Sequence, residues 1–318
     1  MNALASPASL KGVLGPVQAA AALAAGLRRT VEALEAPVAD GGEGTAEVLC
    51  AAQGGHWFTA EVPDALGRRV TARWLVLPDG TAVVDSAEAV GLARLAADEL
   101  DPLRATSHGL GELLLAVLEH RPRALVVGVG GTATVDGGVA MRAVVGGRLR
   151  ALPLRVACDV RNPLLGPRGA ARVFGPQKGA GPAAVEELER RLASLEELAP
   201  YRDLAGAGAG GGLGAALAAL GAELCEGAEL VLDAIGFDEL ARAAALVVTG
   251  EGTVDATTFE GKAPGAVAAR CARLGVRCEL FGGIVRDGID AHALSADPAR
   301  AVDDLVALGD RLGRALLE

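Results

Sequence analysis

The sequence predicts an α/β protein with two α/β domains, in which a second mixed domain is inserted into a flavodoxin-like parallel-sheet domain. Parallel strand–loop–helix units are indicated by short apolar runs that lead into glycine-rich loops near Ala3, Pro37, Leu125, Leu246 and Glu279. A different pattern interrupts them over residues 56–90, where apolar and polar residues alternate between Gly-Arg and Asp-Gly turns. The expected parallel-sheet domain comprises residues 1–52, 91–138 and 204–318, and the inserted domain comprises residues 53–90 and 139–203.

Each element of the first half has a local signal. A strand is expected over residues 2–7, and a helix with basic residues in its last turn follows over 16–29. A short strand at 36–39 leads into the loop 40–45. After the antiparallel patch, helices are expected at 92–101 and 106–119, the second with Thr106-Ser107 as its cap, and a buried strand at 125–127.

The second half continues the same alternation. The apolar run 154–158 predicts a buried strand, and 185–198 predicts a charged amphipathic helix. The glycine-rich stretch 206–214 is expected to open a helix over 213–224 and to offer an anion site at its start. The remaining predicted elements are strand 246–249, helix 265–274, strand 279–281 and an amphipathic helix over 301–317.

Composition limits the function classes. The chain has 318 residues, 51% hydrophobic but only 3% aromatic, so two cores must be built from Ala, Val and Leu. The net charge of −10 argues against nucleic acid, whose binding relies on basic surface. The chain has three lysines, Lys11, Lys178 and Lys262, and each lies in a glycine-rich motif that suits a small anionic ligand.

Cysteine usage and the absence of targeting signals predict a cytoplasmic protein. The five cysteines show no CxxC spacing and mostly lie in apolar surroundings, which is typical of reduced thiols. The histidines match no zinc spacing, and no basic region of a signal peptide begins the chain. The uncharged run 204–222 contains only four leucines, too few for a membrane helix, so no membrane partner is expected.

Several stiff loops carry charged and amide side chains beside the expected strands. Asp159 follows the strand 154–158. The turn dipeptides Asn162-Pro163 and Gly166-Pro167 come next, and Arg168 and Lys178 follow on the same stretch of loop. The loop 40–45 would attract an anion to its helix entry, but its carboxylates would repel one unless a cation such as Mg²⁺ intervened. The simpler alternative for each acid is a helix cap or a turn-stabilising side chain.

Two glycine-rich loops follow strands as phosphate-binding loops do. Residues 128–138 follow one buried strand and 250–252 follow another, so free N–H groups would face a nucleotide. A dinucleotide-binding fingerprint and a Walker motif are both missing, which argues against a dehydrogenase and a P-loop protein.

The motifs together resemble one family. CDVRNPLLG (158–166) with FGPQKGA (174–180) resembles the class I glycerate kinases, which phosphorylate glycerate with ATP. Four further stretches are similar to that family's other motifs, in its order: PVADGGEGT, GVGGTATVDGG, GAGAGGGLG and GEGTVDATTFEGKAP. The resemblance implies an active-site cleft between the two domains, ATP as cosubstrate, Mg²⁺, and conversion of D-glycerate to 2-phosphoglycerate. It also implies a cytoplasmic transferase, with a homodimer as one expected assembly.

Site roles follow from the motifs and the resemblance. Catalytic roles are expected for Asp159, Lys178, Asp255 and Lys262. Glycerate binding is expected at Lys11, Asp40, Asn162 and Arg168. Nucleotide binding is expected at Gly128, Gly130, Gly131, Thr132, Gly250 and Glu251. Mg²⁺ binding is expected at Asp40, Asp136 and Glu251.

Three departures from the family pattern keep alternatives open. Ala8, Val135 and Thr257 stand where the family usually has an acid, an Asn and a Gln. One alternative is a kinase of a different small hydroxy acid. The other is a catalytically impaired relative that keeps the fold and binds a ligand.

Overall fold

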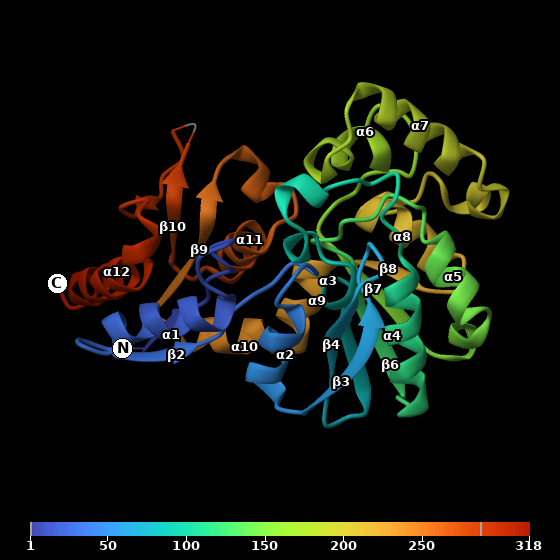
Figure 1. The fold of residues 1–318 in the computed structure, drawn as a ribbon. Coiled ribbons are helices and arrows are strands. Elements are labelled where there is room, and N and C mark those ends of the chain that lie inside the picture. The colour runs from blue at the N-terminus through green and yellow to red at the C-terminus, as the bar shows by residue number, and fades with distance from the viewer. Residues whose placement is uncertain (1, 287) are drawn as a thin grey trace. The chain divides into compact units, whose positions relative to one another are not determined.

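The computed structural model describes residues 2–286 and 288–318, which form two compact units. Unit 1 comprises Met1–Asp40, Glu47–Gln53 and Ala228–Glu318, and unit 2 comprises Gly41–Ala46 and Gly54–Gly227. Along the chain, unit 2 is therefore inserted into unit 1, as the change in sequence pattern predicts. Figure 1 shows the elements of both units.

Unit 1 contains a parallel five-stranded sheet with the order β11-β10-β9-β1-β2. Numbered within the unit, this order is 2-1-3-4-5, which is the order of a flavodoxin-like sheet, the type of sheet expected from the sequence. Every neighbouring pair is parallel, with Ala3 opposite both Ala33 and Leu246. The strands are β1 (Asn2–Ala5), β2 (Glu32–Glu35), β9 (Leu246–Val254), β10 (Cys278–Val285) and β11 (His292–Ala293).

Both faces of this sheet are buried under helices. Side chains alternate along a strand, so Ala3 and Ala5 join one apolar cluster while Leu4 joins another. The first face is covered by α1 (Pro16–Leu27) and α12 (Ala301–Ala315). The other face packs against α9 (Gly227–Ala234), α10 (Phe237–Arg242) and α11 (Ala263–Leu274).

The helices α1 and α12 meet backbone to backbone. A Cβ added at Gly26 would lie 2.1 Å from the carbonyl oxygen of Val306, and one at Gly309 would lie 2.4 Å from that of Leu23. Only glycine permits this approach. The contact places the start of α12 above the carboxyl ends of the unit 1 strands, where the cavity described below is found.

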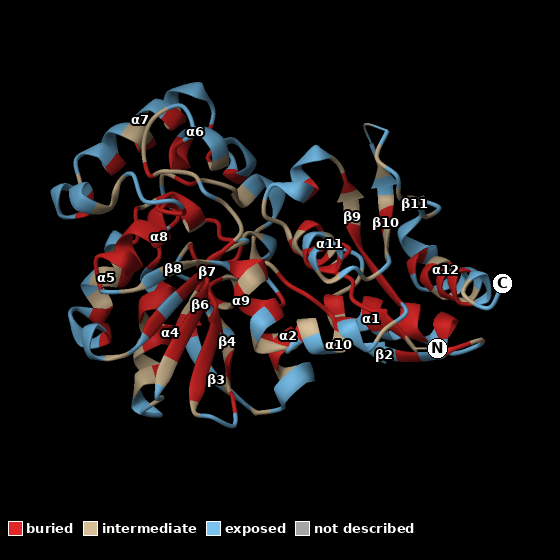
Figure 2. Ribbon diagram, turned by 180° about the vertical axis from the view of Figure 1, so that it is seen from behind, coloured by how far each residue is buried: buried red, intermediate tan, exposed pale blue. Residues whose placement is uncertain are grey.

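Unit 2 is built on a mixed six-stranded sheet with the order β3-β4-β5-β6-β7-β8. The first three strands are antiparallel, which confirms the alternating pattern read over residues 56–90, and the others are parallel. Its central strands are buried on both faces (Figure 2). The strands are β3 (His56–Pro63), β4 (Arg69–Val76), β5 (Thr81–Asp85), β6 (Ala124–Gly128), β7 (Leu154–Cys158) and β8 (Glu223–Glu226).

The predicted domain boundaries need correction. Residues 91–138 and 204–227 were expected in the parallel-sheet domain, but they belong to unit 2. The reason is that β6 forms its hydrogen bonds with β5 and β7, not with β1 or β9. An apolar run shows that a strand is buried but does not show which sheet it joins.

Three element predictions are also wrong in detail. The strand expected at 36–39 is β2 at Glu32–Glu35, an edge strand whose exposed glutamates concealed it. The helix expected at 92–101 consists of two short 3-10 turns, Leu92–Arg94 and Ala97–Glu99. The helix expected at 213–224 ends at Ala218, and β8 follows it.

The remaining helices complete the two units. α2 (Thr45–Gln53) follows the loop 40–44. Unit 2 also contains α3 (Ala87–Val90), α4 (His108–Glu119), α5 (Val139–Val145), α6 (Ala170–Phe174), α7 (Pro182–Ala193) and α8 (Ala209–Ala218). Within the part of the chain that the structure describes, no helix is long and apolar enough to cross a membrane.

The buried guanidinium of Arg270 joins three helices of unit 1. Its side chain on α11 is 7% exposed and pairs with Glu229 and Asp233 on α9 and with Asp238 on α10. Each carboxylate is at least 38% exposed, so solvent weakens each pair. Among the described residues, no other carboxylate pairs with this buried cation.

We therefore expect Arg270→Ala to lower the free energy of unfolding by about 2 kcal/mol or more, measured by urea denaturation. Arg242→Ala is the matched control, because its pair with Asp238 is exposed and should contribute less than about 1 kcal/mol. Equal losses in the two variants would contradict this account of the helix junction.

Candidate functional site

The unit 1 sheet reverses its strand order between β1 and β9. Open α/β sheets bind ligands outside the carboxyl ends of the strands at such a reversal. A cavity of about 330 Å³ lies there, lined by the ends of β9 and β10, the loop after β1 and the segment that leads into α12. Three sequence-predicted site residues line it, namely Lys11, Glu251 and Lys262.

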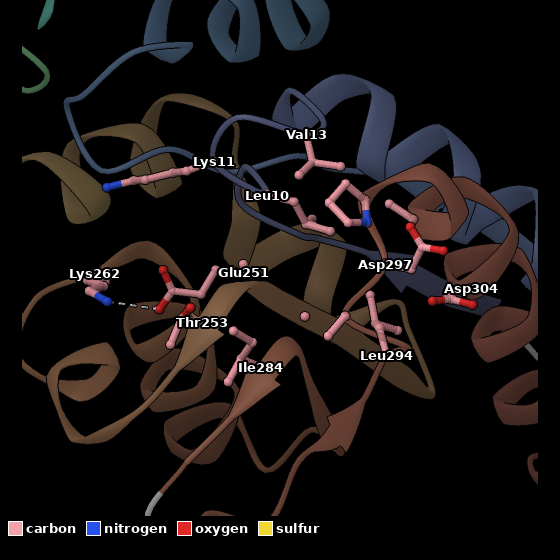
Figure 3. A pocket seen from close by; sticks show the side chains of 15 residues that line it. Leu10, Lys11, Val13, Glu251, Thr253, Lys262, Ile284, Leu294, Asp297 and Asp304 are labelled. Atoms are coloured by element: carbon pink, nitrogen blue, oxygen red, sulfur yellow. Dashed lines mark hydrogen bonds and ion pairs between the residues drawn. The ribbon is translucent and has the colours of Figure 1, made fainter. Parts of the chain in front are cut away.

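The carboxylate of Glu251 is the buried member of these three charged residues. Glu251, on β9, accepts a hydrogen bond at Oε1 from the hydroxyl of Thr258 at 2.7 Å. The ammonium of Lys262 lies 3.3 Å from the same oxygen (Figure 3). Glu251 is only 7% exposed, so these two donors compensate for its loss of water.

The loop geometry around Lys262 suits an anion. Lys262 is the residue before the first turn of α11, a helix of 12 residues, and helix starts favour negative charge. A Cβ at Gly265 would lie 2.2 Å from the carbonyl oxygen of Thr258, so α11 packs directly on the turn that carries Thr258. These contacts fix the start of α11 and the side chains of Lys262 and Glu251 relative to one another.

The other predicted residues of unit 1 have simpler roles in the structure. Asp255 caps the 3-10 turn Ala256–Phe259, and its Oδ1 accepts from Thr257 N at 2.9 Å and from the Thr257 hydroxyl. The hydroxyl bond of Thr257 lowers the pKa of Asp255, which makes it a weaker proton acceptor. A Cβ at Gly250 would lie 2.1 Å from the carbonyl oxygen of Phe281, so strand packing requires that glycine. Asp40 lies half-buried in the loop after β2.

Glycines of unit 2 bring two motif loops into backbone contact. Gly41 has φ +89°, and a Cβ there would lie 2.6 Å from the carbonyl of Ala157 at the end of β7. A Cβ at Gly128 would lie 2.7 Å from Gly41 O, and one at Gly130 would lie 2.6 Å from Gly42 Cα. Packing alone therefore requires Gly128 and Gly130, without any nucleotide.

The glycine-rich stretch 206–214 has a similar supporting role. Gly211 has φ +74°, and a Cβ there would lie 1.9 Å from the carbonyl oxygen of Thr134. Gly137 N donates to Gly211 O at 3.0 Å, which ties this stretch to the loop 134–137. The N–H groups of Gly211 and Gly212 both donate to Gly208 O, so they do not form the anion site expected from the sequence.

The loop 128–138 holds the buried ammonium of Lys178. Lys178 is 4% exposed, and its Nζ donates to Thr134 O at 2.8 Å and lies 3.3 Å from the Thr132 hydroxyl. Burial lowers the pKa of Lys178 to about 7, although the nearby Asp136 carboxylate opposes the shift. The structure thus brings the motifs 128–138 and 174–180 together, as their shared chemistry suggested.

Lys178 and Thr134 each have one polar group that still lacks a partner in the described structure. An ammonium carries three N–H donors, and the contacts to Thr132 and Thr134 use two of them. The buried hydroxyl oxygen of Thr134 has no hydrogen-bond partner among the residues that the structure describes. A small anion that accepts hydrogen bonds would satisfy the third N–H of Lys178.

The remaining predicted residues of unit 2 lie in two places. Asp136 accepts at Oδ2 from Ser107 N at 2.9 Å and from the Ser107 hydroxyl at 2.8 Å, and at Oδ1 from Gly138 N at 3.1 Å. Both of its oxygens thus hold the loop. Asn162 Nδ2 donates to Arg168 O at 2.7 Å, which joins the two ends of that turn. Asp159 is half-buried at the end of β7.

Sequence reasoning missed the supporting roles of Asp85 and Ser107. Asp85 Oδ2 accepts from Gly44 N at 3.2 Å and from Ala46 N at 3.3 Å, so it fixes the loop 41–46. The Ser107 hydroxyl also accepts from Met141 N at 2.9 Å. A usable signal was present for Asp85, because it ends an apolar strand as Asp159 does.

Two of the three departures from the family pattern lie at buried positions, and the third, Thr257, is exposed. Val135 is 1% exposed and Ala8 is 7% exposed, and each belongs to an apolar cluster. The Thr257 hydroxyl donates to Asp255. Among the described residues, no group of three or more His, Cys, Asp or Glu side chains could hold a metal ion.

The fold and these charged loops define a phosphotransferase of the α/β class. The chain belongs to the glycerate kinase family, whose model matches residues 3–151 and 145–302. It is 39% identical to the glycerate 2-kinase of Escherichia coli, with 84% of this chain and 81% of that protein covered. It is 35% identical to the glycerate kinase of Halalkalibacterium halodurans, with 96% and 94% covered.

A solved structure supports the same family and fold. A crystal structure from Salmonella typhimurium, described as a glycerate kinase 2, matches with a TM-score of 0.84 at 34% identity. The match covers 100% of this chain and 98% of that one.

The lowered pKa of Lys178 gives a testable pH dependence of stability. Lys178 loses its proton near pH 7 in the folded protein, whereas an unfolded lysine keeps it to about 10.5. Between these values unfolding takes up a proton, so the stability of the wild type rises with pH. We therefore expect the free energy of unfolding of the wild type to rise relative to that of Lys178→Met by up to about 1.4 kcal/mol per pH unit across this window.

Urea denaturation at pH 6.5 to 9.5 measures this change. Lys11→Met is the control, because it makes the same replacement at an exposed lysine. A pH-independent difference for Lys178→Met would show that Lys178 titrates normally.

Proposed function

We propose that the protein transfers the γ-phosphoryl group of ATP to the 2-hydroxyl of D-glycerate, giving 2-phosphoglycerate and ADP. The observation that carries this proposal is the charged end of the unit 1 cavity in a chain of the glycerate kinase family. There Lys11, Lys262 and the start of α11 supply positive charge for phosphate oxygens.

Unit 1 residues stabilise the phosphate charge in this proposal. Lys262 neutralises the transferring group, and Glu251 holds Lys262 in place through their ion pair. Phosphoryl transfer forms a bond from the substrate oxygen to γ-phosphorus while the bond to the bridging oxygen breaks. Positioning and charge neutralisation are therefore the main requirements on the protein.

Unit 2 residues bind and activate the acid in this proposal. The third N–H of Lys178 and the unpaired Thr134 hydroxyl bind the carboxylate of glycerate. Arg168 and Asn162 lie on the neighbouring turn and add a further cation and an amide. Asp159 orients the hydroxyl and takes up its proton.

The donor set fits Mg²⁺ only in part. Mg²⁺ is usually held by one or two carboxylates together with phosphate oxygens and water, so a cluster of three acids is not needed. Glu251 and Asp40 would hold it, and bound Mg²⁺ would neutralise phosphate charge. Asp136 does not fit, because both of its oxygens already accept from Ser107 and Gly138.

Location and assembly belong to the same proposal. The five cysteines are free, which is typical of a reducing compartment, so we place the protein in the cytoplasm. A homodimer is proposed from the family resemblance, and analytical ultracentrifugation tests it.

The proposed reaction predicts ADP release that depends on glycerate. A coupled assay with Mg-ATP and D-glycerate, tartronate or lactate should give turnover with glycerate, and phosphorus NMR should identify 2-phosphoglycerate. The burial of Val135 and Ala8 favours glycerate over another acid, since neither departure alters an exposed polar contact. ADP release with tartronate or lactate alone would identify a different hydroxy-acid kinase.

A pair of variants on one helix links this activity to the site. Lys262→Met should lower kcat about a hundredfold, because it removes one preorganised charge from the transferring phosphate. Arg273→Met, at the exposed end of the same helix, should keep kcat within about twofold. Equal activity in the two variants would remove Lys262 from the proposed mechanism.

A further inference from the structure

The unit 1 cavity has a large apolar wall that phosphate binding does not use. Two of its side chains are unusually exposed for their size, since Val13 is 38% exposed and Ile284 is 45% exposed. Leu10, Leu294 and Pro298 complete the wall. Concave apolar surfaces with a few polar groups are the usual form of small-molecule sites.

The polar groups of the cavity lie at its two ends. In Figure 3, Lys11, Lys262 and Glu251 lie at one end, and Asp297 and Asp304 lie at the other. The side chains of Ile284 and Leu294 lie between these ends. A matching ligand is therefore anionic at one end, flat or apolar in the middle, and a hydrogen-bond donor at the far end.

The acidic end is held in a fixed position. Asp297 Oδ1 accepts from Ala299 N at 3.0 Å, and Asp304 Oδ2 accepts from Ser295 N at 2.9 Å. The hydroxyl of Ser295 also donates to Asp304 and lowers its pKa, so the carboxylate is ionised at neutral pH. Ionised carboxylates accept hydrogen bonds only, so this end selects a donor such as an amine.

We propose that this cavity binds the adenosine part of ATP, with the phosphates directed towards Lys11 and Lys262. This inference rests on the proposed kinase function. The base lies against Ile284 and the apolar wall, and its 6-amino group donates to the carboxylates of Asp297 and Asp304. Lys11 then contacts the nucleotide, not glycerate as the sequence analysis expected.

Glycerate fits this cavity poorly. At about 330 Å³ the cavity falls in the size range of sites for much larger ligands than a three-carbon acid. Glycerate is polar over its whole surface, so it would leave the apolar wall uncovered. Its carboxylate would also be repelled by Asp297, and by Asp304 to the extent that the Arg300 guanidinium, 3.7 Å away, leaves its charge uncompensated.

Adenosine is the direct probe, because it lacks phosphates and so tests the apolar part alone. We expect adenosine to compete with Mg-ATP but not with glycerate in wild-type kinetics. Ile284→Glu should raise the adenosine inhibition constant and the Kd of Mg-ATP about tenfold or more. The glycerate KM should stay within about twofold.

Two further variants keep the test decisive. Val13→Glu lies on a different, exposed loop of the same cavity and should have the same effect even if Ile284→Glu folds poorly. Leu34→Glu is the matched control, because Leu34 is 50% exposed on β2 and lies outside the cavity. Circular dichroism melting confirms that each variant is folded.

The acidic end gives an independent measurement. Inosine triphosphate has a carbonyl oxygen in place of the amino group, so the wild type should prefer ATP by about tenfold or more in kcat/KM. Asp297→Asn should reduce that preference, because an amide can also donate to the carbonyl oxygen.

The outcomes separate this inference from the proposed function. Unchanged adenosine and ATP binding in folded Ile284→Glu and Val13→Glu would overturn the cavity assignment while glycerate kinase activity stands. Weakened nucleotide binding in a protein that does not phosphorylate glycerate would support the cavity assignment and reject the proposed substrate.

Discussion

The backbone contact between Gly211 and the carbonyl of Thr134 is the constraint on which the unit 2 site depends. A Cβ at Gly211 would lie 1.9 Å from that oxygen, and the same oxygen accepts from Lys178 Nζ at 2.8 Å. The glycine thus allows one loop to support another, and the supported loop holds a buried ammonium. Lys178 keeps little contact with water, so its charge is available to an acid that supplies the missing hydrogen bonds.

Local sequence signals predicted the elements better than their partners. The strand at Leu154–Cys158 was predicted at its observed bounds, and unit 1 contains the predicted parallel, flavodoxin-like sheet. Whether β6 pairs with β7 or with β1 depends on contacts far apart in the chain, which periodicity does not report. For this reason residues 91–138 were placed in the wrong domain.

The site shows a similar limit. The sequence singled out Lys178 and Lys262 because lysines are rare in this chain and lie in the motifs, and the structure shows Lys178 buried and Lys262 paired with Glu251. It could not separate glycines that admit a ligand from glycines that admit another backbone, as at Gly128. It also could not separate catalytic acids from caps such as Asp255, since both roles use the same residue type in the same loops.

The proposed role of Lys178, held as a buried cation for the acid substrate, can be measured directly. Because the chain has three lysines, NMR of ¹⁵N-labelled lysine side chains can follow Lys178 through a pH titration, with Lys178→Met to assign its signal. We expect a pKa near 7 for Lys178 in the free protein and a higher pKa when D-glycerate is bound, since a nearby anion favours the charged form. A Lys178 pKa near the ordinary 10.5, unchanged by D-glycerate, would contradict it.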